Sequence, residues 1–481
     1  MITFIICLAL LITAYFTYGR YLEKVAEADD SNTPPAMRLN DGVDYMPLPR
    51  WRVFLIQLLN IAGTGPIFGA ILGACFGPVA FIWITLGGIF FGAMHDYLSG
   101  MMILRHDGKS LPEVIGDYLG MNARSVIRVF SIALMVLVGA VFILSPAQLL
   151  NSMVPGVSKD IWVWIILAYY IIATMLPVDK VIGKLYPIFG IALIAMALGL
   201  LIVLFSGAYP IPEITFGTLH NYQLNPEALP IIPTLFITIA CGAISGFHAT
   251  QSPLMARCVT SEKKCRSVFY GSMISESVIA LIWAAIAMAF FYGPTGLGEN
   301  LAQHGGNAAW VVDTISKTTL GQVGAILALL GVVAAPITSG DTAFRGARLI
   351  VADIFKVDQK PIMKRFMICI PLFVVGYGIT LVNFDVVWRY FAWANQALAC
   401  AVLWTIFTWL TVKGKNYWIA LIPAIFMTFV ETYFVFISPQ FFGFENRLIG
   451  VGLAVILTFV TFAWVMSRVK ALKSYTKLAV D

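Results

Sequence analysis

The stretch LFITIACGAISGFHATQSP, residues 235–253, decides how this chain is expected to fold. It begins as an apolar helix, and Gly242, Ser245 and Gly246 then weaken the helical preference within a few residues. Glycine inside a helix costs about 1 kcal/mol relative to alanine. Polar residues follow, and we expect Pro253 to close the run. The pattern predicts a helix that is broken near its middle.

The composition places this broken helix in a membrane. The chain has 481 residues, of which 59% are hydrophobic and 12% are charged, whereas soluble domains carry about 25% charged residues. Many of its apolar runs are long enough to cross a bilayer. Backbone groups freed inside a bilayer need partners, so a broken helix survives there only beside protein or a water-filled cavity. The chain is therefore predicted to be an all-α polytopic membrane protein.

The distribution of basic residues predicts the number and direction of the spans. If the N-terminus lies outside, the cytoplasmic side receives 27 of the 31 lysines and arginines; Lys159, Lys317, Arg389 and Arg447 are the exceptions. This partition predicts that the N-terminus lies outside and the C-terminus in the cytoplasm. The expected location is a bacterial-type cytoplasmic (inner) membrane, which the chain crosses many times. The thirteen predicted spans are residues 2–18, 53–75, 78–104, 126–150, 160–177, 185–207, 229–250, 267–292, 318–340, 362–383, 387–412, 415–437 and 446–468.

Loops between the spans carry two further expectations. Residues 107–125 and 341–361 are predicted to form short interfacial helices on the cytoplasmic side. Residues 293–311 are rich in glycine and are expected to form an outer loop that can act as a lid.

A second break lies in NIAGTGPIFGAILGACFGP, residues 60–78, where Gly63, Gly65 and Pro66 stand close together. The two broken spans start five spans apart and run in opposite directions. This pattern is typical of inverted repeats in transporters, whose site lies between the broken helices. Positive helix ends can then hold an anionic group, and freed carbonyls can hold a cation. The alternative is that the glycines only pack helices together, as GxxxG spacing often does.

The inverted repeats predict four segments. Residues 1–52 form a first helix and a cytoplasmic loop, 53–228 the first repeat and 229–412 the second repeat. Residues 413–481 form two accessory helices and a short basic tail.

Six stretches resemble the carbon starvation A (CstA) family in its compact form. The resemblance implies membership of the amino acid–polyamine–organocation superfamily and a LeuT-type fold with five-plus-five inverted repeats. It also implies proton-driven uptake of peptides or pyruvate and a link to carbon starvation. The stretches are NDGVDYMPLPRWRVF (40–54), IAGTGPIFGAILGACFG (61–77), RHDGKSLPEVI (105–115), FITIACGAISGFHATQS (236–252), YGSMISES (270–277) and ANQALA (394–399).

The substrate is expected between the two breaks. Peptides and pyruvate both carry a carboxylate, which positive helix ends can bind, so the charge of the site does not choose between them. The predicted substrate-binding residues are Gly63, Thr64, Gly65, Pro66, Cys241, Gly242, Ser245, Gly246, His248 and Gln251.

Ionisable residues within spans cost about 2.5–3.5 kcal/mol on insertion scales and usually have a function. Glu276 is the leading candidate for a proton carrier, and Asp96 is the second. The alternatives are a neutral Glu276 bonded to a neighbouring helix, and an Asp96 that anchors its helix against Arg105. His248 is expected either to contact a substrate carboxylate or to cap backbone carbonyls.

A candidate cation site follows from the resemblance, because LeuT-type transporters carry a sodium site of hydroxyls and carbonyls. Thr338, Ser339 and Asp341 supply oxygens here, and Ile61 begins the stretch of carbonyls that would face them. The alternative is a helix C-terminus at which Asp341 faces Arg345. Proton coupling therefore stays the preferred expectation and sodium coupling the alternative.

No cofactor, metal site or disulfide framework is expected, since the seven cysteines are scattered and no CxxC occurs.

An enzyme is not expected either: neighbouring His95 and Asp96 should point to different helix faces, and HExxH and GxSxG motifs are absent. A membrane sensor or channel is a further alternative. Asn395 and Gln396 are predicted to bridge helices, and the alternative is that they line the transport pathway. The expected partners are a small-molecule substrate and membrane lipid, without nucleic acid, and a homo-oligomer is conceivable.

Overall fold

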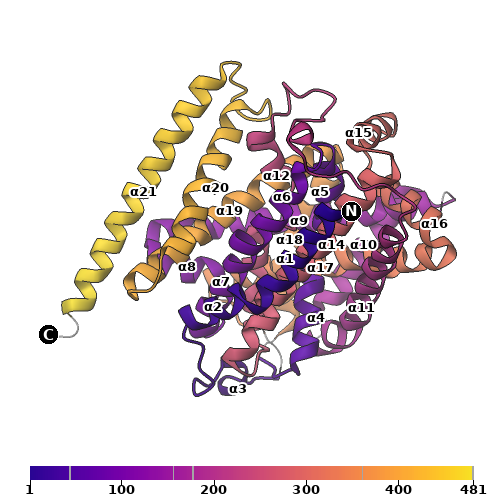
Figure 1. Cartoon of the computed structure of the whole chain (residues 1–481). Helices are drawn as coiled ribbons and strands as arrows, with labels where there is room; N and C mark the ends of the chain where they lie inside the picture. The colour runs from indigo at the N-terminus through magenta and orange to yellow at the C-terminus, as the bar shows by residue number, and fades with distance from the viewer. Residues whose placement is uncertain (43–44, 155, 176–177, 360, 479–481) are drawn as a thin grey trace.

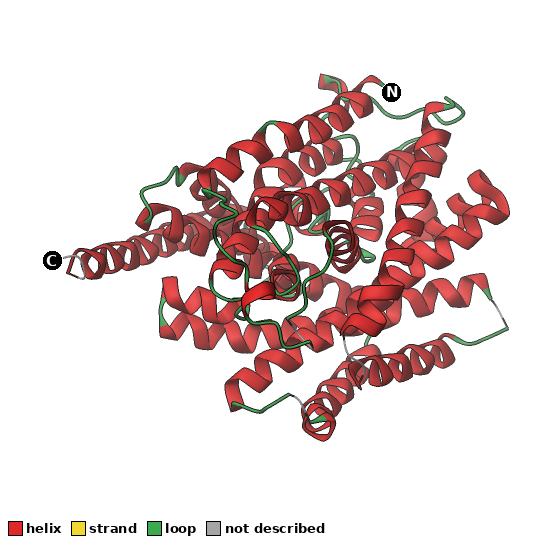
Figure 2. Ribbon diagram, turned by 90° about the horizontal axis from the view of Figure 1, so that it is seen from below, coloured by secondary structure: helices red, strands yellow, loops and turns green. Residues whose placement is uncertain are grey.

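The structure is a computed structural model that describes residues 1–42, 45–154, 156–175, 178–359 and 361–478. Every regular element in these residues is a helix, as Figure 2 shows from below. The all-α prediction is confirmed. Ten described helices are long and apolar enough to cross a membrane, or up to eleven if the bent pair α4–α5 counts as one span. The predicted total of thirteen stays a prediction.

The first half of the chain contains α1 (Ile2–Phe16), α2 (Tyr18–Val25), α3 (Pro35–Arg38), α4 (Arg50–Ile61), α5 (Gly65–Ala74), α6 (Val79–Ile82), the π-helix η1 (Trp83–Ala93), α7 (Met94–Arg105), α8 (Leu111–Leu119), α9 (Met121–Met153), α10 (Lys159–Met175), α11 (Val178–Phe205) and the 3-10 turn η2 (Phe216–Thr218). The second half contains η3 (Ile231–Leu235), α12 (Phe236–Thr238), α13 (Gly246–Ala256), η4 (Glu262–Lys264), η5 (Arg266–Tyr270), α14 (Gly271–Phe290), α15 (Pro294–Gln303), α16 (Ala308–Leu327), η6 (Ala328–Val333), α17 (Ala334–Phe355), α18 (Ile362–Thr380), α19 (Phe384–Val412), α20 (Trp418–Ile437) and α21 (Arg447–Leu478).

The helices pack around a centre formed by α4, α5, α9, α13, α14 and α17 (Figure 1). Helix α14 is almost entirely buried and packs along α5 and η1. Helices α20 and α21 lie at one edge of the molecule, where they pack mainly on each other and on α19 (Figure 1). Two central segments are not continuous helices, and both coincide with the predicted breaks.

The loops that are rich in basic residues lie together on one face. Their contacts join segments far apart in the sequence, which is the arrangement expected if they share one side of a membrane. The ion pairs between them join Arg38 to Asp107, Arg105 to Glu262 and Lys415 to Glu27.

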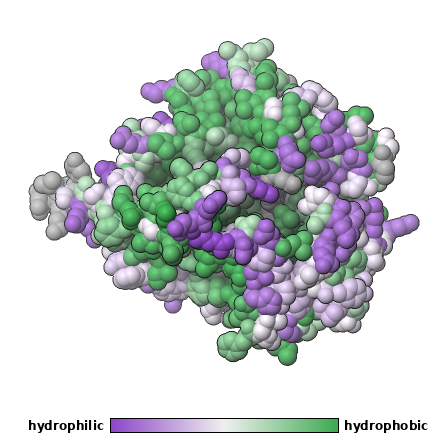
Figure 3. Space-filling view, turned by 90° about the horizontal axis from the view of Figure 1, so that it is seen from above, coloured by the Kyte–Doolittle hydropathy of each residue, from purple (hydrophilic) through white to green (hydrophobic). Residues whose placement is uncertain are grey.

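The opposite face carries the loops that are poor in basic residues. Met1 and Thr3 in α1 bind the side chain of Glu213, and Arg447 binds the backbone of Glu227. Figure 3 shows this face from above, with polar residues across its centre and one side and apolar residues around them.

The prediction for residues 341–361 is wrong. Helix α17 runs without interruption to Phe355, so most of this segment is buried helix rather than an interfacial one. Arg345 and Arg348 had been assigned to a cytoplasmic loop, and each is only 2% exposed. Arg345 donates to the carbonyl of Ala173 and lies 3.8 Å from Asp341, and these contacts offset part of the cost of burying its charge.

The predictions for the two other loops, residues 107–125 and 293–311, can also be compared with the structure. Residues 107–125 do contain a short helix, α8, beside the basic loops. The predicted outer loop 293–311 contains helix α15, which begins at Pro294 and ends at Gln303. A lid role for it stays a prediction.

Candidate functional site

The two predicted breaks lie directly against each other. Helices α4 and α5 meet at an angle of 47° across the gap that follows Ile61. A stripe of glycines at every fourth position of α5 faces the second break: a Cβ at Gly65 would lie 2.3 Å from Sγ of Cys241, and one at Gly69 would lie 3.0 Å from the carbonyl of Thr238. The absence of side chains on this stripe is what permits the contact. The glycines therefore pack two segments closely together, as the alternative interpretation states, and they also lie beside the break.

The second break spans residues 239–245, between α12 and α13. Gly242 has a φ of +89°, a conformation that other residues rarely adopt. A freed carbonyl is satisfied by protein: the indole of Trp83 donates to the carbonyl of Ile239 at 3.1 Å. The expectation that Pro253 closes the run is wrong, because α13 continues through it to Ala256.

Helix α13 begins at Gly246, and its first turn is fixed from α19. Oδ1 of Asn395 accepts a hydrogen bond from the backbone amide of Phe247 at 2.7 Å and another from Oγ of Ser245 at 3.1 Å. The first of these bonds satisfies an amide that a helix start leaves free. Gly246 has no room for a side chain, since a Cβ there would lie 2.4 Å from the backbone nitrogen of Ala399. The predicted bridging role of Asn395 is confirmed.

The neighbouring Gln396 also bridges helices as predicted. Its Nε2 donates to the carbonyl of Phe236 at 3.1 Å. The two adjacent amides therefore hold both halves of the broken segment, one before the break and one after it.

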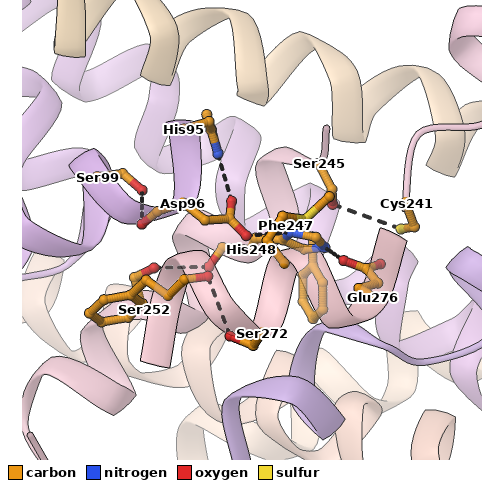
Figure 4. A network of polar contacts seen from close by, with 12 residues as sticks. His95, Asp96, Ser99, Cys241, Ser245, Phe247, His248, Ser252, Ser272 and Glu276 are labelled. Carbon is orange, nitrogen blue, oxygen red and sulfur yellow. Dashed lines mark hydrogen bonds and ion pairs between the residues drawn. The ribbon is translucent and has the colours of Figure 1, made fainter. Parts of the chain in front are cut away.

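Four ionisable side chains meet just beyond the break, and all are completely buried (Figure 4). Nδ1 of His248 lies 2.8 Å from Oδ2 of Asp96, and its Nε2 lies 3.3 Å from Oε2 of Glu276. Nδ1 of His95 lies 2.8 Å from the other carboxylate oxygen of Asp96. One imidazole therefore stands between two carboxyl groups that come from different helices, α7 and α14.

This arrangement corrects two expectations. Asp96 does not anchor its helix against Arg105, which pairs with Glu262 instead. His95 and Asp96 were expected to point to different faces, but their side chains are bonded to each other. The ring of His248 contacts carboxyl groups rather than backbone carbonyls.

Small residues let α7 and α14 reach the break. A Cβ at Gly92 would lie 2.2 Å from the carbonyl of Ala243, and one at Gly88 would lie 2.3 Å from Oγ of Ser277. Both glycines are in η1, one helical spacing apart, as in other close membrane contacts. This approach brings Asp96, which follows η1, next to His248.

Of the remaining substrate-site candidates, only Pro66 lies beside the second break. Thr64 Oγ1 lies 3.3 Å from Oγ of Ser145 in α9, and a Cβ at Gly63 would meet the ring of Phe142. Pro66 lies near Gly242. Gln251 is buried further along α13. The structure thus gathers Gly65, Pro66, Cys241, Gly242, Ser245 and His248 in one region, with Gly246 at its edge.

Sequence reasoning missed two contributors. His95 had been considered only as part of a catalytic pair, and it supports Asp96. Ser145 had not been considered, although it precedes Pro146 inside the long helix α9. A proline in a helix frees a carbonyl and often marks a functional position in membranes, so that signal was present in the sequence.

The hydroxyls of the candidate cation site already have protein partners. Ser339 Oγ donates to the carbonyl of Leu59 at 2.9 Å, and Thr338 Oγ1 donates to the carbonyl of Ala335 at 2.7 Å. Helix α17 therefore contacts α4 at Leu59, two residues before the predicted carbonyl of Ile61. Both hydroxyls lie within α17 and not at a helix end.

Asp341 has a partner that neither interpretation named, in addition to Arg345. It accepts a hydrogen bond from the hydroxyl of Tyr186 in α11 at 2.9 Å, and Arg345 lies 3.8 Å away. The predicted pairing with Arg345 is present, but in the middle of α17 rather than at a C-terminus.

A cleft of about 560 Å³ opens on the face that is poor in basic residues. It is lined by Phe68 of α5, by Ile237 and Thr238 of α12, and by Trp388 and Arg389 of α19, among others. The rings of Phe68 and Trp388 lie 6.0 Å apart between centroids. The cleft thus ends a few residues from Cys241 and Gly242.

Comparison with known proteins assigns the family. The model of the family described as carbon starvation protein CstA matches residues 1–157, 145–317 and 295–433. The chain belongs to the CstA family. The resemblance noted in the sequence is confirmed, and with ten or more candidate spans this CstA-family chain is a multi-pass membrane protein.

Three relatives show how much of the chain is shared with known proteins. An uncharacterized membrane protein of Haemophilus influenzae is 43% identical over 353 residues, which cover 63% of this chain and 94% of that protein. The peptide transporter CstA of Helicobacter pylori strain 26695 is 30% identical, over 56% of this chain and 48% of that protein. The pyruvate/proton symporter BtsT of Escherichia coli K12 is 26% identical, over 68% of this chain and 55% of that protein. The chain thus matches about half the length of these named transporters.

Proposed function

We propose that this protein is a secondary active transporter that imports small carboxylate-bearing nutrients, peptides or pyruvate, by alternating access coupled to protons. The observation that carries the proposal is the completely buried Asp96–His248–Glu276 cluster at the junction of two broken helices. Related proteins named as a peptide transporter and as a pyruvate/proton symporter support it.

The proposal includes a LeuT-type arrangement. Residues 53–228 and 229–412 would form the two inverted repeats of a thirteen-span protein, preceded by 1–52 and followed by 413–481. The contact between the α4–α5 bend and the 239–245 break supports this division, since such repeats place their broken helices together. The N-terminus would lie outside the cytoplasmic membrane and the C-terminus inside, because the basic loops share one face.

The substrate carboxylate would bind where two helix starts converge. Helix α5 begins at Gly65 and α13 begins at Gly246, and both starts lie near Cys241. Each start carries a partial positive charge and amides that lack intrahelical partners. In the present conformation these residues are closed off, so substrate entry requires the outer cleft to extend inward past Phe68 and Trp388.

Proton coupling would use His248 as the link between two carboxyl groups. The cluster is buried, and an uncompensated charge in such surroundings is costly. Two carboxylates with one imidazolium leave a net negative charge, which one more proton removes. We infer that this proton binds at Glu276 while the site faces outward and leaves when the site faces inward. Asp96 and His95 would hold the imidazole in place throughout.

Sodium coupling is the alternative, and one observation bears on it. Ser339 joins α17 to α4 just before the break, at the place where a LeuT-type cation site would lie. Its hydroxyl and that of Thr338 have protein partners, and the carboxylate of Asp341 binds Tyr186. These contacts favour protons over sodium as the coupling ion.

Uptake into proteoliposomes tests the proposal. Purified protein would be given labelled pyruvate or a labelled dipeptide under an imposed proton gradient, an imposed sodium gradient, both, or neither. We expect accumulation above the external concentration only with the proton gradient, and its collapse on addition of a protonophore. Uptake that merely equilibrates would instead indicate a channel, and dependence on sodium alone would favour the alternative.

A further inference from the structure

Three side chains at the break combine the ligand types that zinc-class ions prefer. One ligand atom each from Cys241, His248 and Glu276 lies within 4.8 Å of the others. His248 and Glu276 are fully buried, and Cys241 is 4% exposed. Thiolate, imidazole and carboxylate are the usual ligands of Zn²⁺. We propose that these three residues form a binding site for a divalent transition-metal ion of the Zn²⁺ class.

The hydrogen bonds of His248 prepare it as a ligand. Its Nδ1 lies 2.8 Å from Oδ2 of Asp96, and that carboxylate is held in turn by His95. A neutral imidazole that donates its Nδ1 proton to a carboxylate keeps a lone pair on Nε2. Metal-binding histidines are oriented by this same carboxylate contact. His248 therefore directs its Nε2 lone pair towards Glu276 and Cys241.

Polar atoms that face this point lack hydrogen-bond partners. Nε2 of His248 and both carboxyl oxygens of Glu276 are buried without one among the described residues. Nε2 and Oε2 are 3.3 Å apart. With the Nδ1 proton on His248, these atoms present a lone pair and a carboxylate to each other, which is unfavourable unless a proton or a cation lies between them. A metal ion satisfies both atoms.

Cys241 completes the site and has its own supporting contacts. Its sulfur lies 3.8 Å from Oγ of Ser245 and 3.7 Å from Nδ2 of Asn395. The thiol donates to Oγ of Ser245, whose own proton goes to Oδ1 of Asn395. The amide of Asn395 donates to the sulfur and can stabilise a thiolate. On binding, the thiol proton leaves to solvent and the sulfur gives an electron pair to the metal.

The charge and the ligand chemistry select the ion. The thiolate of Cys241 and the carboxylate of Glu276 carry two negative charges, which match a divalent cation, so the complex adds no net charge to the buried site. Sulfur and nitrogen ligands favour Zn²⁺ over Mg²⁺ or Ca²⁺. Three protein ligands also leave a fourth position open for water or another small ligand.

The same residues explain why spacing did not reveal the site. Cys241 and His248 come from the break and the first turns of α13, and Glu276 comes from α14. No short motif joins them. The ion would arrive through the outer cleft, which ends at Ile237 and Thr238 a few residues before Cys241.

Metal binding would also exclude the coupling proton, because both need Glu276 and His248. Zn²⁺ should therefore inhibit proton-driven uptake. This consequence rests on the proposed function, whereas the binding itself does not, so the two are tested separately.

Direct binding to the purified full-length protein, freed of its affinity tag and treated with chelator, tests the site. Titration with Zn²⁺ against a chromophoric chelator should give one ion per chain. Replacing Zn²⁺ with Co²⁺ should give the absorption of a cobalt–thiolate bond. The variant Cys241→Ser should lose that absorption, while Cys369→Ser and Cys400→Ser, which remove buried thiols elsewhere, should keep it.

Two further variants distinguish the loss of a metal ligand from misfolding as the cause of weaker Zn²⁺ binding. Glu276→Gln should lower the affinity for Zn²⁺ with the thiolate absorption weakened, and Asp96→Asn should lower it about 10–100-fold by releasing His248. Every variant would first be checked for a monodisperse elution profile. The site is refuted if the wild-type protein binds no Zn²⁺, or if well-folded Cys241→Ser binds it with unchanged affinity and spectrum. Transport without added metal reports on the proposed function alone.

Discussion

The contact between the two breaks makes a quantitative prediction for Gly65→Ala. The new Cβ would lie 2.3 Å from Sγ and 2.6 Å from Cβ of Cys241. Carbon and sulfur atoms in contact need at least about 3.5 Å, so one of the two segments must move by roughly 1 Å. Overpacking of this kind costs about 1–3 kcal/mol. Part of this is offset by the better helix propensity of alanine, worth up to about 1 kcal/mol, so we expect a net loss of about 1–2 kcal/mol.

A double-mutant cycle assigns this loss to the contact. Cys241→Gly removes both atoms that the new Cβ would meet, so Gly65→Ala should be nearly neutral in that background. The coupling between the two changes is then about 1–2 kcal/mol, within the range seen for residues in contact. Gly378→Ala in α18 is the matched control; nothing lies within 4 Å of its added Cβ, so it should be neutral or slightly stabilising.

The assay is reversible chemical unfolding in mixed micelles, followed by tryptophan fluorescence and circular dichroism. The free energies of unfolding of the four proteins in the cycle give the coupling directly. If Gly65→Ala costs the same with and without the Cys241 side chain, the two breaks do not touch as described. If Gly378→Ala is equally destabilising, the effect of Gly65→Ala is not specific to the break.

Further variants probe the surroundings of the site. Asn395→Ala leaves the buried amide of Phe247 without an acceptor and should cost about 1–3 kcal/mol in unfolding free energy; Asn395→Asp restores the acceptor, and equal losses in both would contradict the capping role. Arg389→Gln should raise the apparent KM for an anionic substrate at low ionic strength without lowering the maximal rate, because Arg389 lines the outer cleft; an unchanged KM would remove it from substrate capture. Asp341→Asn leaves buried Arg345 without its nearby charge and should lower the free energy of unfolding by about 3–5 kcal/mol. Protein that is still well folded should keep proton-driven uptake. A selective loss of stimulation by sodium would instead support the candidate cation site.

The breaks were predictable because their causes are local. Glycine and proline weaken a helix wherever they stand, so 60–78 and 235–253 could be identified from composition alone. Their mutual contact is also marked in the sequence, because the glycines of α5 recur at every fourth position.

The cluster of ionisable residues could not be assembled in this way. Asp96 and His248 are 152 residues apart, and nothing in either helix specifies the other as its partner. Hydropathy also misplaced the end of α17. Asp341, Arg345 and Arg348 lower the local hydropathy as a loop would, yet they are buried. Asp341 and Arg345 find partners on the distant helices α11 and α10. Tertiary contacts decided these positions, and local sequence did not.

The central claim is that the Asp96–His248–Glu276 cluster couples transport to protons. Glu276→Gln tests it, because glutamine keeps the shape of the side chain and cannot release a proton. Glu431→Gln is the matched control: Glu431 in α20 is also buried, with neither carboxyl oxygen hydrogen-bonded among the described residues, and it lies outside the cluster.

The most direct measurement compares two modes of transport in proteoliposomes that contain the wild-type protein, Glu276→Gln or Glu431→Gln. One mode is accumulation of labelled substrate under an imposed proton gradient, and the other is exchange of internal for external substrate at equal pH. We predict that Glu276→Gln abolishes accumulation and retains exchange, while Glu431→Gln retains both. Accumulation by Glu276→Gln at the wild-type level would contradict the account.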